Sequence, residues 1–231
     1  MNGRVRIRVS GALACFSRPE MKVERMSYEV MTPSAARGVL DAVLWKPQMR
    51  WVVHKIEVLA PIRFLSFRRN ELQDKVPKRT VEGWMADPSK YEPQAAGAGS
   101  DAATPRGTVA LKDVAYVIEA SPLVYSEDKE NRPEKYIGMF ERRVEQGQCF
   151  HRAYLGCREF ACDFEPARPK ELPIKETRDL GLMLYDVIFK DGANRPLFFK
   201  ATLQDGVLLT DPREVLEPAQ REELHACSYK R

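Results

Sequence analysis

The sequence predicts an α+β fold, and three observations lead to this class. Residues 26–51 have the pattern of one helix held between two strands. A second helix pattern begins at Pro133 and again lies between strand patterns. The last part of the chain holds short apolar runs separated by KDGANR and QDG, whose Asp-Gly pairs favour tight turns between antiparallel strands. With 231 residues, the chain is long enough for one large or two small domains.

The first expected elements are a strand and a helix. In residues 4–10, arginines alternate with β-branched residues, which is typical of a half-buried strand. Its polar face is either solvated or available to an anion, and it carries Arg4, Arg6 and Arg8. In the helix, Thr32 can cap the first turn and Pro33 suits the first helical position, while Lys46-Pro47 ends it. Apolar residues at helical spacing predict its buried stripe: Ala36, Val39, Leu40, Val43 and Leu44.

The middle of the chain alternates strand patterns with a charged insertion. Residues 50–62 are rich in β-branched and aromatic residues and predict a strand that ends at Pro61. Residues 66–106 are first dense in charge and then small and polar, so we expect an inserted basic arm with a mobile tip near residues 97–104. Order is expected to resume in one or two strands that reach Ala120.

The second helix and the strand after it complete the pattern. The helix is expected to end at Gly147 and to bury Ile137, Phe140 and Val144. Phe160, Cys162 and Phe164 then alternate as they would on one face of a strand.

The resulting order is strand, helix, strand, insertion, strand, helix, strand. This is the split β-α-β plan of a ferredoxin-like or RNA-recognition fold. We therefore expect a ferredoxin-like domain over residues 1–165 and a small C-terminal antiparallel β domain over residues 174–231. The charged tail of the second domain, from Asp211, is expected to be frayed.

Composition narrows the classes of function. The net charge of +4 and the pI near 8.8 allow a nucleic-acid partner without requiring one. The five cysteines are an odd count without framework spacing, which indicates reduced thiols in the cytoplasm. Their spacing also fits no zinc site, so we expect no metal and no cofactor. No apolar run is long enough to span a bilayer and the N-terminus does not resemble a signal peptide, so no membrane partner is expected.

Five longer motifs stand in order along the chain: GALACFSRPEMKVERMSYEVMTPSAARGVLDAVLWKP, VLAPIRFLSFRRNE, RRVEQGQCF, LGCREF and DLGLMLYD. Together they resemble the Cas-five family of CRISPR subtype I-C, in its d-type branch, from about Arg4 to about Thr210. The resemblance implies an RNA-recognition-type domain with an inserted arm and a C-terminal β domain. It also implies a metal-independent endoribonuclease that cuts precursor CRISPR RNA at the base of the repeat hairpin. The enzyme then stays on the 5′ handle as a subunit of the type I-C surveillance complex.

The resemblance also implies catalytic residues. Metal-free RNA cleavage needs an aligned 2′-hydroxyl, a carrier for its proton and stabilisation of the charge that grows on the phosphate. Family members place a Lys-His pair at the start of the second helix and a Tyr or His near the end of the first. The matching residues here are Lys135 and Tyr136, with Leu44 at the first-helix position.

These departures change the expected chemistry. Lys135 can stabilise the phosphate charge and Tyr136 can hydrogen-bond the 2′-oxygen, but a phenol whose pKa is about 10 is a poor base. We therefore expect a slower nuclease, or one in which another group replaces the missing histidine. His151, in CFHRAYLGCREF, is the candidate, although a lone histidine is more often structural. His54 is interpreted as an ordinary sheet residue, and His225 lies in the charged tail.

Basic residues near the expected edge of the fold are candidates for phosphate binding. They are Arg37 and Lys46 on the first helix, Arg68 and Arg69 in the arm, Arg142 and Arg143 on the second helix, and Arg152 and Arg158 near the fourth strand. Each alone is better explained as a solvated side chain. As a set, they suit an A-form stem and its flanking single strand.

Three functions stay open at this point. The first is the endoribonuclease, with precursor CRISPR RNA, its 5′ handle and the other complex subunits as partners. The second is a non-catalytic subunit that caps the handle, which the missing histidine and Leu44 favour. The third is a general duplex-DNA-binding protein, because phosphate contacts carry no sequence information.

Overall fold

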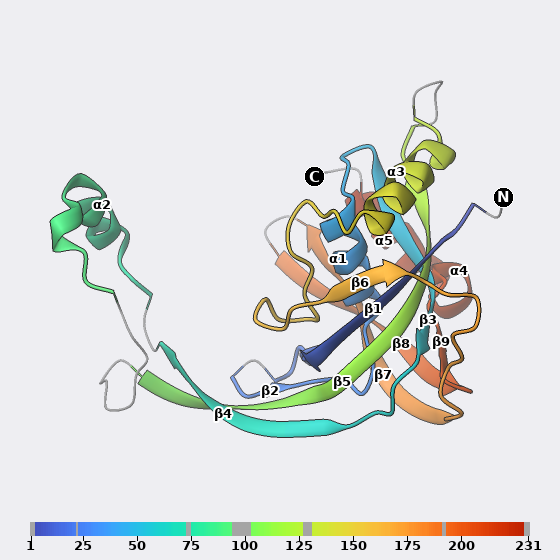
Figure 1. Ribbon diagram of the computed structural model, residues 1–231, viewed down its shortest axis with the longest axis horizontal. Helices are drawn as coiled ribbons and strands as arrows, with labels where there is room; N and C mark the ends of the chain where they lie inside the picture. Colours follow the sequence, from blue (N-terminus) through green and yellow to red (C-terminus); the bar gives the residue numbers. More distant parts are fainter. Residues whose placement is uncertain are drawn as a thin grey trace.

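The computed structural model describes residues 3–21, 23–72, 75–93, 103–126, 131–190 and 193–228. The strands are β1 (Val5–Ala14), β2 (Arg25–Met26), β3 (Met49–Val58), β4 (Phe64–Leu72), β5 (Ala103–Val124), β6 (Asp163–Pro166), β7 (Arg178–Lys190), β8 (Ala193–Gln204) and β9 (Val207–Leu209). The helices are α1 (Pro33–Val43), α2 (Lys78–Ala86), α3 (Pro133–Glu145), α4 (Pro212–Val215) and α5 (Pro218–Ser228), with a 3-10 turn at Pro88–Lys90. The α+β class predicted from the sequence is therefore confirmed (Figure 1).

One large sheet connects almost all of these strands. Its order is β6-β1-β5-β3-β9-β8-β7, and β2 and β4 pair additionally with β5. All of the pairings are antiparallel except that of β2 with β5. The C-terminal strands therefore continue the sheet of the N-terminal ones through the pairing of β3 with β9.

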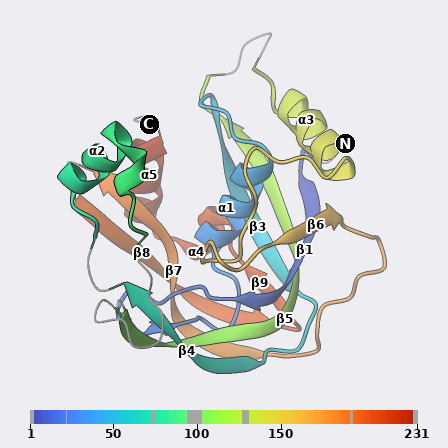
Figure 2. The same ribbon diagram turned by 60° about the vertical axis from the view of Figure 1, so that its left-hand side comes forward.

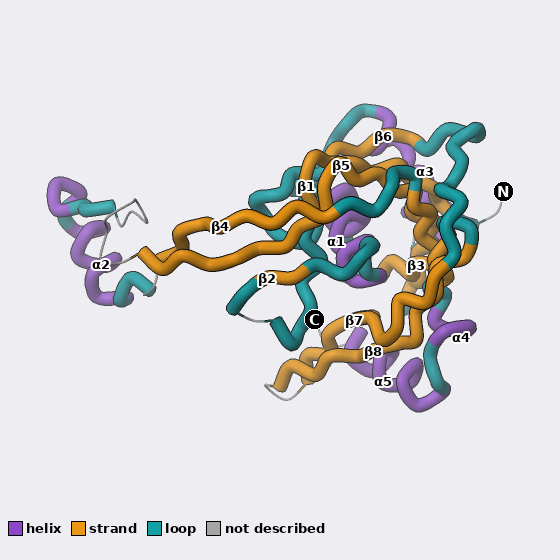
Figure 3. Tube along the Cα trace, turned by 90° about the horizontal axis from the view of Figure 1, so that it is seen from below, coloured by secondary structure: helices purple, strands orange, loops and turns teal. Residues whose placement is uncertain are grey.

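The sheet curls around α1, so that β1 and β5 lie on one side of the helix and β7 and β8 on the other (Figure 3). This enclosure explains why so much of α1 is buried. The predicted stripe is confirmed, and its residues are nearly inaccessible to solvent: Ala36, Val39, Leu40, Val43 and Leu44. The predicted cap is also present, because the Thr32 hydroxyl accepts a hydrogen bond from the Ala35 N–H at 3.2 Å.

The expected hairpin arm is formed by β4 and β5. The two strands pair from Phe64 opposite Leu111 to Leu72 opposite Ala103. The far end of this hairpin projects from the body, and α2 stands beyond it (Figures 1 and 2). Helix α2 was not expected and buries none of its residues. Most of the expected mobile tip lies outside the described residues, but its last two residues, Ala103 and Thr104, already belong to β5.

Three sequence predictions need correction. The strand expected at residues 50–62 ends at Val58, where the backbone leaves the sheet three residues before Pro61. Phe160 and Cys162 are buried but precede the strand, because β6 begins only at Asp163. The tail from Asp211 is not frayed as a whole, since its described part forms α4 and α5. Gln220 of α5 donates to the Phe198 carbonyl of β8 at 3.3 Å.

Candidate nucleic-acid interface and active site

Lys135 and Tyr136 lie in the first turn of α3. Lys135 is exposed, and its Nζ is 5.9 Å from the centroid of the Tyr136 ring. Tyr136 is 2% exposed, and its hydroxyl donates to the Asn131 Oδ1 at 2.8 Å. The amine therefore faces solvent, whereas the phenol packs into the core and holds the segment that precedes the helix.

The end of α1 is closed by donors from three other segments. The Trp51 indole donates to the Leu44 carbonyl at 2.9 Å, and the Arg143 guanidinium donates to the Val43 carbonyl at 2.6 Å. The backbone N–H of Phe150 donates to the Ala42 carbonyl at 2.7 Å. Arg143 therefore caps a helix end in this structure, where its positive charge also suits the helix dipole.

His151 lies on the surface beside this helix end. Its ring is stacked on that of Tyr154, with 6.5 Å between centroids, and its Nδ1 is 3.2 Å from the Arg152 carbonyl. His151 follows the last turn of α3, whereas Lys135 lies in the first. Because an α-helix rises 1.5 Å per residue, about 15 Å of helix axis lies between Lys135 and the last turn of α3, whose Arg143 reaches the same end of α1 as the segment that leads into His151. The structure thus brings Lys135 and Tyr136 together but not Lys135 and His151.

Arg37 and Lys46 line one hollow between α1, β3, β7 and α5. Arg37 donates to the Asp186 Oδ1 at 2.8 Å, and Arg50 donates to the other carboxylate oxygen at 2.5 Å. The three side chains are mostly buried, and burial, followed by the neighbouring Arg37 charge, lowers the pKa of Arg50. The Asp186 carboxylate thus pairs with both guanidinium groups, and Asp41 supplies a second carboxylate to the lining of the hollow.

The two arm arginines differ in their surroundings. Arg69 is paired with Glu159 at 2.6 Å and lies over the rings of Phe67 and Phe160. Arg68 is its exposed neighbour on β4 and makes no ion pair with any described residue. Arg69 therefore ties β4 to the loop before β6, and Arg68 is left to solvent or a ligand.

The remaining candidates gather on α3 and the loop that follows it. Arg142 and Arg158 are exposed, and neither makes an ion pair within the described part of the chain. Arg152 is 74% exposed on its side chain and has only a 3.9 Å approach to Asp163. The Arg142 and Arg158 guanidinium groups therefore stay outside the ion pairs of the described residues, on a surface that also exposes Glu134, Glu141 and Glu145.

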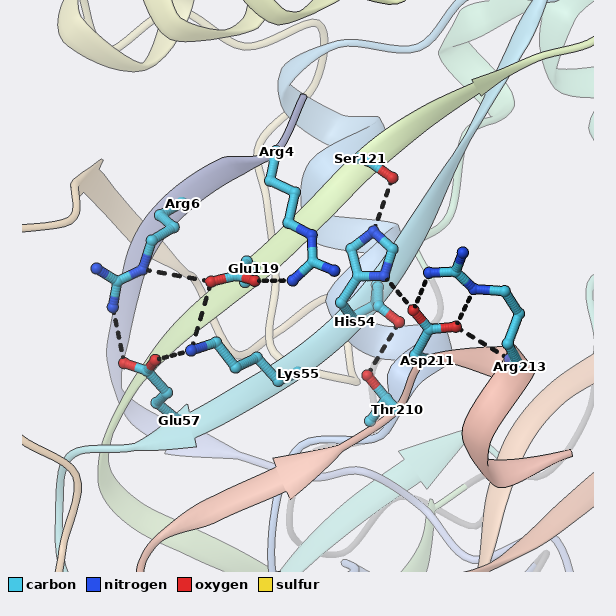
Figure 4. Close-up of polar contacts among 11 residues, drawn as sticks. Arg4, Arg6, His54, Lys55, Glu57, Glu119, Ser121, Thr210, Asp211 and Arg213 are labelled. Carbon is cyan, nitrogen blue, oxygen red and sulfur yellow. Dashed lines mark hydrogen bonds and ion pairs between the residues drawn. The ribbon is translucent and has the colours of Figure 1, made fainter. Parts of the chain in front are cut away.

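The face of the sheet that carries Arg4, Arg6 and Lys55 looks basic in the sequence, but neighbouring carboxylates neutralise its charge. Arg4 pairs with Glu119, and Arg6 pairs with Glu57 and approaches Glu119. Lys55 is 2.9 Å from Glu57 and 3.4 Å from Glu119. Figure 4 shows these five side chains as one network. The arginine row is therefore neither simply solvated nor an open anion platform, because carboxylates occupy it.

His54 lies beside this network and was underestimated from the sequence. Its Nδ1 is 2.8 Å from the Asp211 Oδ2, and its Nε2 is 2.7 Å from the Ser121 hydroxyl (Figure 4). The Arg213 guanidinium beside Asp211 holds the pKa of that carboxyl well below its usual range. With both ring nitrogens engaged and 8% exposure, His54 connects β3, β5 and the turn before α4. The Asp-Pro pair at residues 211–212 is a helix-start signal that could have indicated α4, but it does not specify His54 as the partner of Asp211.

Among the described residues, no group of three or more His, Cys, Asp or Glu side chains is placed to hold a metal ion. Within the same part of the chain, no helix is both long and apolar enough to cross a membrane.

Comparisons with known proteins agree on one family. The sequence model of a family described as "CRISPR-associated protein (Cas_Cas5)" matches residues 5–222. A curated protein of Mannheimia succiniciproducens, named CRISPR pre-crRNA endoribonuclease Cas5d, is 46% identical over 220 residues, which are 92% of this chain and 96% of that protein. A protein of the same name from Thermus thermophilus is 37% identical over 241 residues, which are 96% and 98% of the two chains.

A solved structure extends this agreement to the fold. It is described as "Crystal Structure of CRISPR-associated Protein" and superposes with a TM-score of 0.61 at 22% identity, over 89% of this chain and 90% of that one. The sequence motifs, the family match and the two nearly full-length relatives thus point the same way. The chain belongs to the Cas5d family of CRISPR-associated proteins.

Proposed function

We propose that this protein is a metal-independent endoribonuclease that cleaves precursor CRISPR RNA within the repeat. It then stays bound to the 5′ handle as a subunit of the type I-C surveillance complex, in the cytoplasm. The observation that carries the proposal is the near full-length similarity to two proteins named pre-crRNA endoribonucleases. The exposed Arg142 and Arg158, which make no ion pair with any described residue, support an RNA backbone as the ligand.

The proposal includes a finer description of the fold. Residues 1–165 would form a ferredoxin-like domain with the arm inserted at residues 66–106, and residues 174–231 a C-terminal β unit. The strand order supports the first part: β1 and β3 are joined by α1, and β5 lies between them and pairs with both. This arrangement is a split β-α-β unit. The pairing of β3 with β9 suggests that the two units share one sheet.

In the proposed reaction, the Lys135 ammonium stabilises the negative charge that develops on the scissile phosphate. The 2′-oxygen attacks the phosphorus, the 5′-oxygen leaves, and the products are a 2′,3′-cyclic phosphate and a 5′-hydroxyl. Tyr136 packs into the core and bonds to Asn131, and so fixes the helix turn that carries Lys135. It does not carry the proton of the 2′-hydroxyl, because its own hydroxyl is buried and already donates. His151 and Arg152, beyond the other end of α3, would hold a flanking nucleotide instead. The 2′-hydroxyl proton then passes to water and the leaving 5′-oxygen takes up a proton from water, which predicts a slow nuclease.

Incubation of the purified protein with its cognate repeat RNA tests this proposal. We expect cleavage in the presence of EDTA, and a product that ends in a 2′,3′-cyclic phosphate. Cleavage that requires a divalent cation would contradict the mechanism. Binding of the repeat RNA without any cleavage product would contradict the proposed nuclease activity. It would support a second candidate function, a non-catalytic subunit that caps the 5′ handle.

A specific observation favours that second candidate. The first-helix position that carries a Tyr or His in the family holds the buried apolar Leu44 here, and the second-helix histidine is replaced by the buried Tyr136. Both changes remove proton carriers and leave the basic surface intact.

A third function, general binding of duplex DNA, is tested by competition. Random duplex DNA at matched salt should displace the repeat RNA only at a large excess if RNA is the ligand.

A further inference from the structure

Two cysteines that are distant in the sequence meet where the end of β1 passes the loop between α3 and β6. Cys15 directly follows β1, and Cys157 lies in that loop. The Cys15 N–H donates to the Leu155 carbonyl at 3.0 Å. Gly156 has a φ of +83°, and a Cβ on it would lie 2.0 Å from the Cys15 carbonyl oxygen. Glycine at this position therefore permits the two backbones to touch.

The two thiols point into the same small space. The Ser17 hydroxyl lies 3.6 Å from the Cys15 sulfur and 4.0 Å from the Cys157 sulfur. The Cys157 thiol also donates to the Cys15 carbonyl at 3.7 Å. Cys15 is fully buried, but Cys157 is only half-buried, so a small reagent can reach the pair from the Cys157 side. Adjacent backbones and converging sulfurs are what a disulfide requires.

The electrostatics of the pair favour reaction at neutral pH. The hydrogen bond from Cys157 lowers the pKa of Cys15 to about 7, against the opposing effect of burial, and holds that of Cys157 above its ordinary value. A thiolate next to a thiol is the reactive form in disulfide formation. Cys162 provides the contrast within the same region, because burial raises the pKa of its thiol to about 12.

We propose that Cys15 and Cys157 are a reversible oxidation site that closes to a disulfide when the protein meets a hydroperoxide. Two thiols and one hydrogen peroxide give one disulfide and two waters: the S–S bond forms, the O–O bond breaks, and both thiol protons leave in water. The disulfide would fix residues 155–160 to the end of β1. This segment carries the exposed Arg158 and the Glu159 that pairs with Arg25 and Arg69. The site does not depend on the proposed nuclease activity.

The test treats the reduced full-length protein with hydrogen peroxide, blocks the remaining thiols with N-ethylmaleimide and maps the peptides without reduction. We expect a Cys15–Cys157 cross-link, the loss of two of the five thiols, and full reversal by dithiothreitol. The Cys157→Ser variant should form no cross-link, whereas Cys149→Ser, at an exposed cysteine, should behave like the wild type. Recovery of Cys15 and Cys157 as alkylated thiols in peroxide-treated wild type would overturn the proposal.

A second measurement keeps the test decisive if Cys157→Ser does not fold. The wild-type protein is oxidised once in buffer and once in concentrated urea. We expect the Cys15–Cys157 link to dominate only in buffer, since the fold brings the two together. The oxidised native protein should also unfold at a higher urea concentration than the reduced one. Equal cross-linking among all cysteines in both conditions would show that the fold does not select this pair.

Discussion

Two basic regions of this protein differ in how their charge is used. On the open face of the sheet, Arg4, Arg6 and Lys55 are each within ion-pair distance of Glu57 or Glu119. On α3 and the loop after it, Arg142 and Arg158 have no such partner among the described residues. The two regions look alike in the sequence, where both are rich in arginine. Cross-strand carboxylates, and not the number of arginines, therefore decide which arginines are available to an RNA backbone.

The largest effect is expected at the exposed end of α3, where Lys135→Ala should lower the rate of repeat-RNA cleavage by at least about a hundredfold. The reason is that one cation aimed at a developing phosphate charge contributes about this much to the rate. Binding of the repeat RNA should change by less than about threefold, since one phosphate contact is lost among several. Single-turnover cleavage and a filter-binding assay measure the two quantities. Lys170→Ala, at an exposed lysine outside this surface, is the matched control. Unchanged cutting by Lys135→Ala would remove Lys135 from the site.

The next largest effect is expected at the buried ion cluster in which Asp186 pairs with two arginines. Asp186→Ala leaves Arg37 and Arg50 without their shared carboxylate. Removing one member of a buried ion cluster typically costs about 3–5 kcal/mol, because the remaining charges stay desolvated. We expect a loss of this order in the free energy of unfolding, measured by urea denaturation. Asp163→Ala, whose carboxylate is 82% exposed, should change it by less than about 0.5 kcal/mol. Equal losses in the two variants would mean that the hollow is open to water and weakly coupled.

The arginines of α3 and of the loop after it should dominate the affinity for RNA. Replacing Arg142 and Arg158 by alanine together should weaken binding by roughly tenfold, or about 1.4 kcal/mol. It should also flatten the salt dependence of log Kd by about 0.7 for each lost phosphate contact. Arg4→Ala with Arg6→Ala removes the same charge from the compensated face. That variant should leave RNA affinity within about twofold and lower stability by less than about 1 kcal/mol per pair. Equal losses of affinity in both double variants would abolish the distinction drawn between the two faces.

The compensated face offers a converse experiment. Glu57→Gln combined with Glu119→Gln keeps the side-chain shapes but removes the two carboxylates that neutralise Arg4, Arg6 and Lys55. The face should then attract RNA without regard to sequence. We expect binding of a random single strand to strengthen by about threefold at low salt and to depend more steeply on salt concentration. If the variant binds random RNA no better than the wild type, something other than charge balance keeps RNA off this face.

Local rules predicted the helices of this protein better than its sheet. Thr32, Pro33 and the apolar stripe of α1 act within a few residues of one another, so the pattern determined both the start and the buried face. Helix α2 was missed because it lies in a segment dense in charge and buries none of its residues, so its short apolar stripe belongs to no core. The pairing of β3 with β9 joins residues 150 or more positions apart, and nothing in either short segment specifies its partner.

The candidate site shows the same limit. The basic residues on α3 could be found from the sequence, but their partners could not. Arg37 was expected to face a phosphate and instead donates to Asp186 on β7, which the curled sheet brings across α1. Arg143 was expected to do the same and caps the end of α1. Lys135 is exposed and Tyr136 is buried because of how α3 is rotated about its own axis over the sheet. Two adjacent residues in a sequence do not specify that rotation.

The smallest effect is expected in the pH dependence of stability near His54. Arg213 holds the pKa of Asp211 well below its ordinary value, so the folded protein favours the charged carboxylate. A carboxyl group whose pKa is depressed by folding stabilises the native state above its ordinary pKa of about 3.9, and this contribution is lost as the pH falls through and below that value. Urea midpoints measured between pH 7 and pH 3 should therefore fall less steeply for Asp211→Asn than for the wild type. The variant should start from a lower midpoint at pH 7, because the amide keeps an acceptor for the Arg213 N–H but loses the charge that faces His54 and the Arg213 guanidinium. Parallel pH profiles for the two proteins would mean that Asp211 titrates in the folded chain as it does in the unfolded one, and would leave the His54 contacts without an electrostatic role.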